Sequence, residues 1–407
     1  MFVFQSGIRP SARLAIGVAA LIPFSLLLSG CEQHAAENKV LAQEKSSPRD
    51  SFPNDTALFL AGLKGRPDGP YRDLEQTEAW KNYSARFDRT WTKALRDQFA
   101  PVDAFQKRVL AKLHTGSAYL FYPFSGPDVL YQVHFFPDAT RMVYAGLEPV
   151  GNLKRPEMYK TETLDRELGA WSEALQSIFR RSFFVTSEMD QDFRGQVSDG
   201  NAQIILLLLA RSGDTVDEIQ FGRLEPDGEF RVDDPGLKKH KVAKIEFHCG
   251  AETTERTLYY FSTDLSDSNK AHSAGFVEDP ALEHFLEKQG TADTLVKSAS
   301  FLLHWKMCDA IRGYILTHSN LILEDDSGIP YRFFKAPEWK VELFGQYSHP
   351  DPPFTSQWQT DLAKAFDEPG RAQQLGFQLG YGSLRRPSSL LLAVHSANTQ
   401  AALDPPK

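Results

Sequence analysis

The chain has 407 residues, of which 42% are hydrophobic and 24% charged, so it is long enough for more than one folding unit and too apolar to be disordered overall. It carries 45 Lys and Arg against 53 Asp and Glu, a formal net charge of −8. This acidic balance disfavours a general binder of phosphate backbones, so no nucleic-acid partner is expected. The three cysteines form an odd number, which requires an explanation in an exported protein.

The amino-terminal segment has the pattern of a bacterial export signal. Arg9 and Arg13 precede the uncharged stretch 14–28, which is shorter than the roughly 20 residues of a membrane-spanning helix. Leu28-Ser29-Gly30-Cys31 follows and resembles the lipobox of bacterial lipoproteins. The resemblance implies that 1–30 is a signal peptide, that the Cys31 sulfur carries a diacylglycerol, and that its new amino group is acylated, for example by palmitate. The alternatives are a secretory signal with a chance cysteine and an uncleaved anchor.

The segment after Cys31 is typical of a flexible tether. Residues 32–51 contain no aromatic side chain and mix charges with Ser, Gln and Pro, and such a chain spans roughly 25 Å. Cleavage would remove two arginines and change the formal charge from −8 to −10. Two or three acyl chains are sufficient for stable anchoring. Glu32 resembles the sorting pattern of outer-membrane lipoproteins, so we expect a body attached to the outer membrane and facing the periplasm.

The folded body begins with helical periodicity. Apolar and aromatic side chains recur every three or four residues over 73–99, which predicts an amphipathic helix. Pro101 is expected to break this helix, and 102–113 to continue as a shorter one. We expect the aromatic stripe to belong to the core rather than to a ligand groove; its members are Trp80, Tyr83, Phe87, Trp91, Leu95 and Phe99.

The period then changes, and strands and helices alternate to the end of the chain. Strands are expected in a meander at 117–124, 129–136 and 142–147, and later at 204–210, 219–224, 230–232, 242–248, 257–262, 321–323, 331–334, 341–346, 375–381 and 389–394. Helices are expected at 164–183, 280–289, 291–317 and 357–366. The apolar run 204–210 indicates a central strand buried on both faces.

This order predicts an α+β fold with mostly antiparallel sheet and amphipathic helices packed on it. The segment 151–161 is the best internal boundary, and one large domain or two coupled domains remain alternatives. The expected divisions are a signal peptide at 1–30, the lipidated cysteine and tether at 31–52, a helix-plus-meander region at 53–155, an α+β region at 156–395 and a tail at 396–407.

No strong catalytic motif is present: the chain has no nucleophile elbow, no HExxH zinc motif and no phosphate-binding glycine loop. Ser125-Gly126-Pro127-Asp128 is the densest local signal. Ser125 and Asp128 could serve as a nucleophile and a carboxylate, although a tight turn is favoured because no base can be assigned to Ser125. The glycines of Gly380-Tyr381-Gly382 are expected to form a backbone turn.

The segment Tyr122-Pro123-Phe124-Ser125-Gly126-Pro127-Asp128 resembles an uncharacterised group of secreted and lipid-anchored bacterial proteins. Further parts of the resemblance are Phe135-Phe136-Pro137, Gly146-Leu147-Glu148-Pro149-Val150-Gly151 and Asp325-Asp326-Ser327-Gly328-Ile329-Pro330-Tyr331-Arg332. The group has no established activity, so the resemblance assigns no catalytic residue.

Two acidic clusters are candidates for cation binding. Glu324-Asp325-Asp326-Ser327-Gly328 lacks the alternating ligand spacing of a calcium loop, so a solvated hairpin tip is favoured. Asp190 and Asp192 also lack the ligand spacing of a calcium loop. Neither a metal nor another cofactor is expected.

Cys249 and Cys308 remain once Cys31 is lipidated. In the oxidising periplasm they either pair as a disulfide or stay as buried thiols, and both alternatives remain open. A zinc site formed with His304 and His248 is disfavoured because no CxxC or HxxxH pair is present. The sequence therefore favours a lipid-anchored envelope protein whose body acts as a binding or interaction module for an unidentified envelope protein or ligand. A periplasmic hydrolase with a site near Ser125 and Asp128 is the alternative.

Overall fold

The computed structural model describes residues 51–113, 115–184, 198–234, 236–250, 254–267, 275–384 and 386–399. The signal peptide, Cys31, the tether up to residue 50, the Asp190 and Asp192 pair, and residues 400–407 lie outside the described residues. Within the described part, no helix is both long and apolar enough to cross a membrane.

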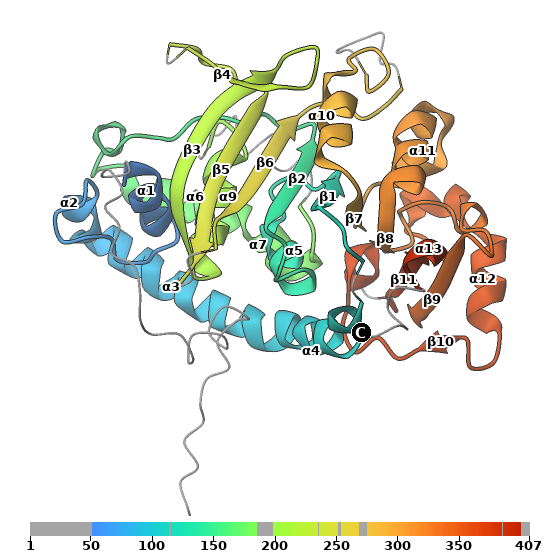
Figure 1. Ribbon diagram of the computed structural model, residues 1–407. Helices are drawn as coiled ribbons and strands as arrows, with labels where there is room; N and C mark the ends of the chain where they lie inside the picture. The colour runs from blue at the N-terminus through green and yellow to red at the C-terminus, as the bar shows by residue number, and fades with distance from the viewer. Residues whose placement is uncertain are drawn as a thin grey trace, which may run out of the picture.

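The predicted α+β class is confirmed: eleven strands form one mixed sheet, with helices packed against it (Figure 1). The strand order is β10-β9-β11-β8-β7-β1-β2-β6-β5-β3-β4. Antiparallel pairs lie on both sides of a parallel centre made of β8, β7, β1, β2 and β6. The strands are β1 (Tyr119–Pro123), β2 (Arg141–Gly146), β3 (Asp214–Leu224), β4 (Phe230–Val232), β5 (Val242–Cys249), β6 (Arg256–Ser262), β7 (Ala292–Val296), β8 (Ser319–Glu324), β9 (Trp339–Gly345), β10 (Ala372–Gln373) and β11 (Ser389–His395).

Helices cover both faces of this sheet. Alternate strand residues point to opposite faces, so Leu120 and Tyr122 of β1 belong to one apolar cluster, and Tyr119 and Phe121 belong to the other. The first face is covered by α1 (Phe52–Leu60), α3 (Glu78–Ala94), α4 (Ala100–Arg108), α5 (Val129–Phe135), α6 (Leu164–Ala174), α7 (Gln176–Arg181) and α9 (Ala202–Arg211). The second is covered by α10 (Ala281–Gln289), α11 (Asp309–His318) and α12 (Thr360–Asp367).

Short elements complete the chain. The one-turn helices α2 (Arg72–Glu75) and α13 (Ser396–Thr399) lie near its two ends. A π turn and several 3-10 turns connect the longer elements: η1 (Leu95–Phe99), η2 (Leu110–Lys112), η3 (Pro156–Met158), η4 (Leu302–His304), η5 (Lys306–Cys308), η6 (Tyr331–Phe333), η7 (Pro352–Gln357) and η8 (Gly380–Leu384).

The long amino-terminal helix is where the periodicity predicts it, and four of its aromatic side chains, those of Trp80, Tyr83, Phe87 and Trp91, are buried as expected for core. Pro101 does not break the chain's helical path. The π turn η1 precedes it, and Pro101 lies in the first turn of α4, where a missing N–H removes no hydrogen bond.

Two segments expected as strands are helices. The apolar run 204–210 lies in α9, which contacts α1, α5 and β3 and is buried along its whole length. Apolarity on every side fits a buried helix as well as a buried strand, and the leucines of this run are good helix formers. The segment 129–136 is α5, because the Asp128 side chain accepts a hydrogen bond from the Tyr131 amide and caps the helix.

The predicted meander is wrong, because its middle segment is the helix α5. Since α5 connects β1 to β2, these strands run parallel to each other.

The segment 291–317, expected as one helix, contains β7, η4, η5 and α11. Ser298, Ser300 and Phe301 adopt positive φ and end the regular structure after β7. The segments 331–334 and 375–381 are a 3-10 turn and an irregular segment rather than strands.

Strands from both expected regions, 53–155 and 156–395, belong to the same sheet, because β1 and β2 lie between β7 and β6. The loop after β2 packs closely on the rest of the chain. Gly151 has a φ of +74°, and its backbone lies against that of Gly200 with no space for a Cβ atom on either residue.

Leu207 of α9 provides a test of the buried helix. Leu207→Ala should lower the free energy of unfolding by about 2–5 kcal/mol, because the side chain is fully buried and its removal leaves a cavity. The measurement is urea unfolding followed by circular dichroism. Leu147→Ala is the control, because Leu147 is 62% exposed and should change stability by less than about 0.5 kcal/mol. Equal stabilities of the two variants would contradict a packed α9.

Candidate functional site

The candidate site lies at the carboxyl ends of the parallel strands β1, β7 and β8. Strands β1 and β7 are neighbours, but β1 continues through α5 on one face to β2, and β7 continues through α11 on the other face to β8. The chain therefore leaves the two strands in opposite directions. In open sheets with helices on both faces, such a point is where ligands commonly bind.

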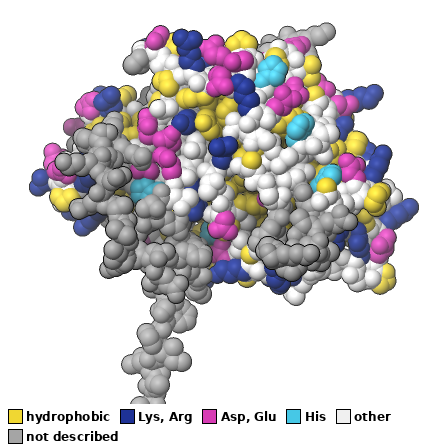
Figure 2. All heavy atoms as spheres, viewed as in Figure 1, with side chains coloured by type: hydrophobic (Ala, Val, Ile, Leu, Met, Phe, Trp, Pro, Cys, Tyr) yellow, Lys and Arg dark blue, Asp and Glu magenta, His cyan; other side chains and the backbone are white. Residues whose placement is uncertain are grey.

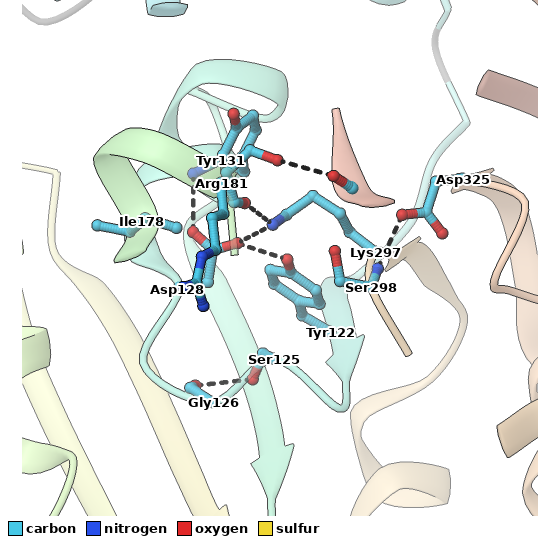
Figure 3. Close-up of polar contacts among 12 residues, drawn as sticks. Tyr122, Ser125, Gly126, Asp128, Tyr131, Ile178, Arg181, Lys297, Ser298 and Asp325 are labelled. Carbon is cyan, nitrogen blue, oxygen red and sulfur yellow. Dashed lines mark hydrogen bonds and ion pairs between the residues drawn. The ribbon is translucent and has the colours of Figure 1, made fainter. Parts of the chain in front are cut away.

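A buried ion pair joins the loops at this point (Figure 3). Lys297 follows β7 directly, and its Nζ lies 2.9 Å from Oδ2 of Asp128; the two side chains are 1% and 3% exposed. The Tyr122 hydroxyl donates to the same carboxylate oxygen over 2.7 Å. Lys297 also donates to the carbonyl oxygen of Ser182 and lies 4.3 Å from the centre of the Tyr131 ring. The ammonium group is thus surrounded by one carboxylate, one carbonyl and one aromatic face.

Asp128 holds this arrangement from the other side. Its Oδ1 caps α5 by accepting a hydrogen bond from the Tyr131 amide over 3.3 Å. Its Oδ2 accepts the hydrogen bond of the Tyr122 hydroxyl and forms the ion pair with Lys297. Burial and the neighbouring carboxylate raise the pKa of Tyr122 well above its usual value, so this hydroxyl keeps its proton and remains a donor.

A second carboxylate joins the loops after β7 and β8. Oδ2 of Asp325 accepts from the Ser298 amide over 2.9 Å, and Oδ1 accepts from the amide and hydroxyl of Ser327. The backbone of Gly380 lies so close to Asp325 that no Cβ atom would fit, and its φ is +55°. The turn expected at 380–382 is therefore present, and Tyr381 donates from its hydroxyl to the Ser298 carbonyl over 3.2 Å.

Backbone strain is concentrated in these loops. In the described ranges, the non-glycine residues with positive φ are Phe124, Ser182, Ser298, Ser300 and Phe301. Each lies in a segment that contributes to the surroundings of Lys297, and left-handed backbone costs a non-glycine residue roughly 1 kcal/mol. The surrounding contacts must hold these conformations in place.

Ser125 and Asp128 both lie here, but they perform separate structural roles. The Ser125 hydroxyl donates to the Gly126 carbonyl over 3.0 Å, and Figure 3 shows Ser125 pointing away from Asp128 and Lys297. Within the described ranges, no histidine is hydrogen-bonded to Ser125. The local geometry is that of a tight turn followed by a helix cap.

The cluster 324–328 is not the solvated hairpin tip that was expected. Glu324, Asp325 and Ser327 are buried, and Glu324 accepts from the Ile329 amide over 2.7 Å. Burial raises the pKa of Glu324 well above its usual value. Among the described residues, no group of three or more His, Cys, Asp and Glu side chains is arranged to hold a metal ion.

Cys249 and Cys308 are not paired with each other, so a disulfide between these two residues is absent from the described part of the chain. Cys308 is a buried free thiol, and burial raises its pKa to about 12. Cys249 is buried at the end of β5. The expected helical face shared by His304 and Cys308 is absent because they lie in the separate turns η4 and η5. His248 is bonded to Asp217 at 2.7 Å instead.

An open cleft of about 1150 Å³ lies beside the ion pair. Ser182, whose carbonyl binds Lys297, lines it, and so does Gln98, whose amide donates to the Tyr131 hydroxyl over 2.7 Å. The other polar lining residues are Thr90, Lys93, Asp97, Arg180, Gln346, Gln378, Ser383, Arg386 and Ser388, and the apolar ones include Phe179, Leu375 and Phe377. We call this the carboxyl-edge cleft.

Charge on the cleft walls is mostly balanced. Lys93 pairs with Asp97 at 2.7 Å, and Arg386 pairs with Asp351. The surface in Figure 2 has the same mixed character, with basic and acidic side chains interspersed over the face shown. Amide and hydroxyl groups therefore give the cleft most of its hydrogen-bonding capacity.

Comparison of the chain with protein-family models, with curated proteins and with solved structures gives no match.

Lys297 is the central residue that sequence reasoning missed. It lies in a stretch that was interpreted as helix, where a single lysine has no distinguishing pattern. The signal that could have revealed it is the run Lys297-Ser298-Ala299-Ser300 directly after the short apolar strand of β7.

Removing the ammonium group tests the buried pair. Lys297→Met should lower the free energy of unfolding by about 3–5 kcal/mol, because it leaves the Asp128 charge buried and unpaired. Adding Asp128→Asn should recover part of this loss. Urea unfolding gives the comparison, with the exposed Lys81→Met as control, which should cost less than about 1 kcal/mol. A loss for Lys297→Met no greater than that of the control would contradict the assignment.

Asp326 predicts a pH dependence of stability. Burial and the neighbouring Asp325 raise its pKa from 3.8 to about 8, so between these values the folded chain binds more protons than the unfolded chain. Stability should therefore fall as pH rises from about 4 to about 8. Asp326→Asn should flatten this slope, as measured by urea midpoints across the range. The exposed Asp367→Asn should leave the slope unchanged, and equal slopes for all three proteins would exclude the effect.

Proposed function

We propose that this chain is a lipid-anchored protein of the bacterial cell envelope whose folded body binds a polar ligand in the carboxyl-edge cleft. The anchor is supported by Arg9, Arg13 and the lipobox ending at Cys31. The tether then allows the body to stand off the outer membrane on its periplasmic side.

The observation that carries the binding function is the cleft itself, which lies beside a topological switch point and beside the buried ion pair of Lys297 and Asp128. Side chains in a rigid cleft wall are already ordered, so ligand binding costs less conformational entropy. Its amide and hydroxyl groups, together with the rings of Phe179 and Phe377, fit a ligand rich in hydroxyl and amide groups.

A hydrolase receives less support from the same geometry. Ser125 is bonded to a backbone carbonyl, and Asp128 is occupied by Lys297, Tyr122 and the cap of α5. A nucleophile needs an adjacent base to activate it. We therefore favour binding without covalent chemistry.

Cys31→Ser tests the anchor. The wild-type protein should sediment with membranes after a high-salt wash and carry acyl mass on its amino-terminal peptide, whereas the variant should be released. Membrane retention of the variant together with an unmodified wild-type peptide would overturn this part of the proposal.

Binding is tested on the purified body with tri-N-acetylchitotriose, which carries both hydroxyl and amide groups. Calorimetry should detect saturable binding that Gln346→Trp weakens by filling the cleft, while Glu218→Trp at an exposed position of β3, outside the cleft lining, leaves it unchanged. Equal binding by both variants would exclude the cleft, and absence of binding would exclude this ligand class. Ester hydrolysis abolished by Ser125→Ala would favour the hydrolase instead.

A further inference from the structure

A second cavity lies at the opposite end of the parallel strands. It has a volume of about 290 Å³ and is lined by the first residues of β1 and β2, by the end of α5, and by α4 and η2. Its lining includes Gln106, Leu110, Ala111, Leu113, Ser117, Tyr119, Leu120, Phe135, Phe136, Asp138, Arg141, Asp293 and Leu321. We call it the amino-edge cavity.

A carboxylate of β7 lies at this cavity. Asp293 accepts from the Ser117 hydroxyl over 2.7 Å on Oδ1 and from the Thr115 hydroxyl over 3.0 Å on Oδ2. Asn320 fixes both neighbours by donating to the Thr115 carbonyl and to the Ser117 hydroxyl. The carboxylate is therefore held in one orientation before any ligand arrives.

No cation balances this carboxylate in the described part of the chain, since no ion pair joins Asp293 to a Lys, Arg or His there. This distinguishes it from Asp128, which has Lys297. Burial raises the pKa of Asp293 to about 6. An anionic Asp293 therefore has no counter-charge from the described residues, and each carboxylate oxygen can accept a further hydrogen bond.

The walls around Asp293 combine polar and apolar groups. Leucine side chains and the rings of Phe135 and Phe136, which can pack against hydrocarbon and attract a cation through their faces, lie beside polar residues that include Gln106, Ser117 and Thr140. The charged groups on the lining, Asp138 and Arg141, are exposed. One half-buried carboxylate and two hydroxyls are too few oxygens for a calcium site, which needs six to eight ligands.

We infer that the amino-edge cavity binds a small organic cation, in which a protonated amine contacts Asp293 and an apolar body fills the space lined by the leucines and phenylalanines. The ammonium group supplies a counter-charge that the described part of the fold does not, and its hydrogen bonds reach the oxygen lone pairs that Ser117 and Thr115 leave open. This site does not depend on the carboxyl-edge cleft.

The test compares benzylamine with benzyl alcohol, which has the same ring but carries no charge. Calorimetry on the wild-type body at pH 7.5 should show saturable binding of benzylamine and binding of benzyl alcohol that is weaker by roughly tenfold or more. Asp293→Asn should reduce the affinity for benzylamine to that for the alcohol. Asp138→Asn is the matched control and should retain most of the wild-type affinity.

A second variant keeps the carboxylate and narrows the cavity. Ala111→Trp changes an exposed lining residue and should weaken benzylamine binding without loss of the folded state, which circular dichroism and the melting temperature monitor for every variant. Equal affinities for the amine and the alcohol would overturn the inference. So would benzylamine binding that Asp293→Asn leaves unchanged, or the absence of saturable benzylamine binding.

Discussion

The ion pair between Lys297 and Asp128 is the constraint on which the centre of this fold depends. Two charges removed from water are stable only when their geometry and remaining hydrogen bonds are satisfied. Here the partners come from three segments: the loop after β1, the loop after β7 and the residue that follows α7. All three must be in place together, so the pair couples parts of the chain that leave the sheet in different directions.

This coupling explains why the strained residues collect at one edge. Ser298 has a positive φ, yet its amide donates to Asp325 and its carbonyl accepts from Tyr381. The backbone amide and carbonyl of Ser298 are thus used within the protein, whereas its hydroxyl is buried without a hydrogen-bond partner in the described part of the chain. The centre is consequently closed, and the accessible surface for a ligand is the cleft that shares Ser182 and Gln98 with it. Such a division, with a rigid paired interior and an adjacent open wall, favours binding over covalent chemistry.

The sequence predicted the elements whose signal is local. The aromatic spacing from Trp80 to Trp91 identifies α3, and the strands expected at 219–224 and 230–232 lie in β3 and β4. It failed where tertiary contacts decide between alternatives. The run 204–210 is apolar on every side, so periodicity cannot distinguish strand from helix. The parallel centre of the sheet was missed for a related reason: once α5 was taken for a strand, no connection between β1 and β2 was long enough for a parallel crossover.

The candidate site was predicted in part, because turn-forming residues are visible in sequence and their partners are not. The loops at 125–128, 324–328 and 380–382 were each singled out, and the structure brings all three to one edge of the sheet. Each was interpreted as an isolated turn, and 324–328 as a solvated one. Their proximity depends on the order of β1, β7 and β8, and no spacing along the chain encodes that order.

Asp128 and Asp293 show how the two ends of the parallel strands differ. Both carboxylates are removed from most solvent and held by hydroxyl donors, but among the described residues Asp128 has an internal cation and Asp293 has none. An internal cation makes a carboxylate a structural element, because any ligand would have to displace it. A carboxylate without an internal cation is either protonated or able to pair with a cation from outside the protein. Burial raises the pKa of Asp293 to about 6, so the protonated and ionised forms of this carboxylate are both populated near that pH. Electrostatic binding energy is therefore available at the amino edge, whereas at the carboxyl edge it is already used to hold the fold together.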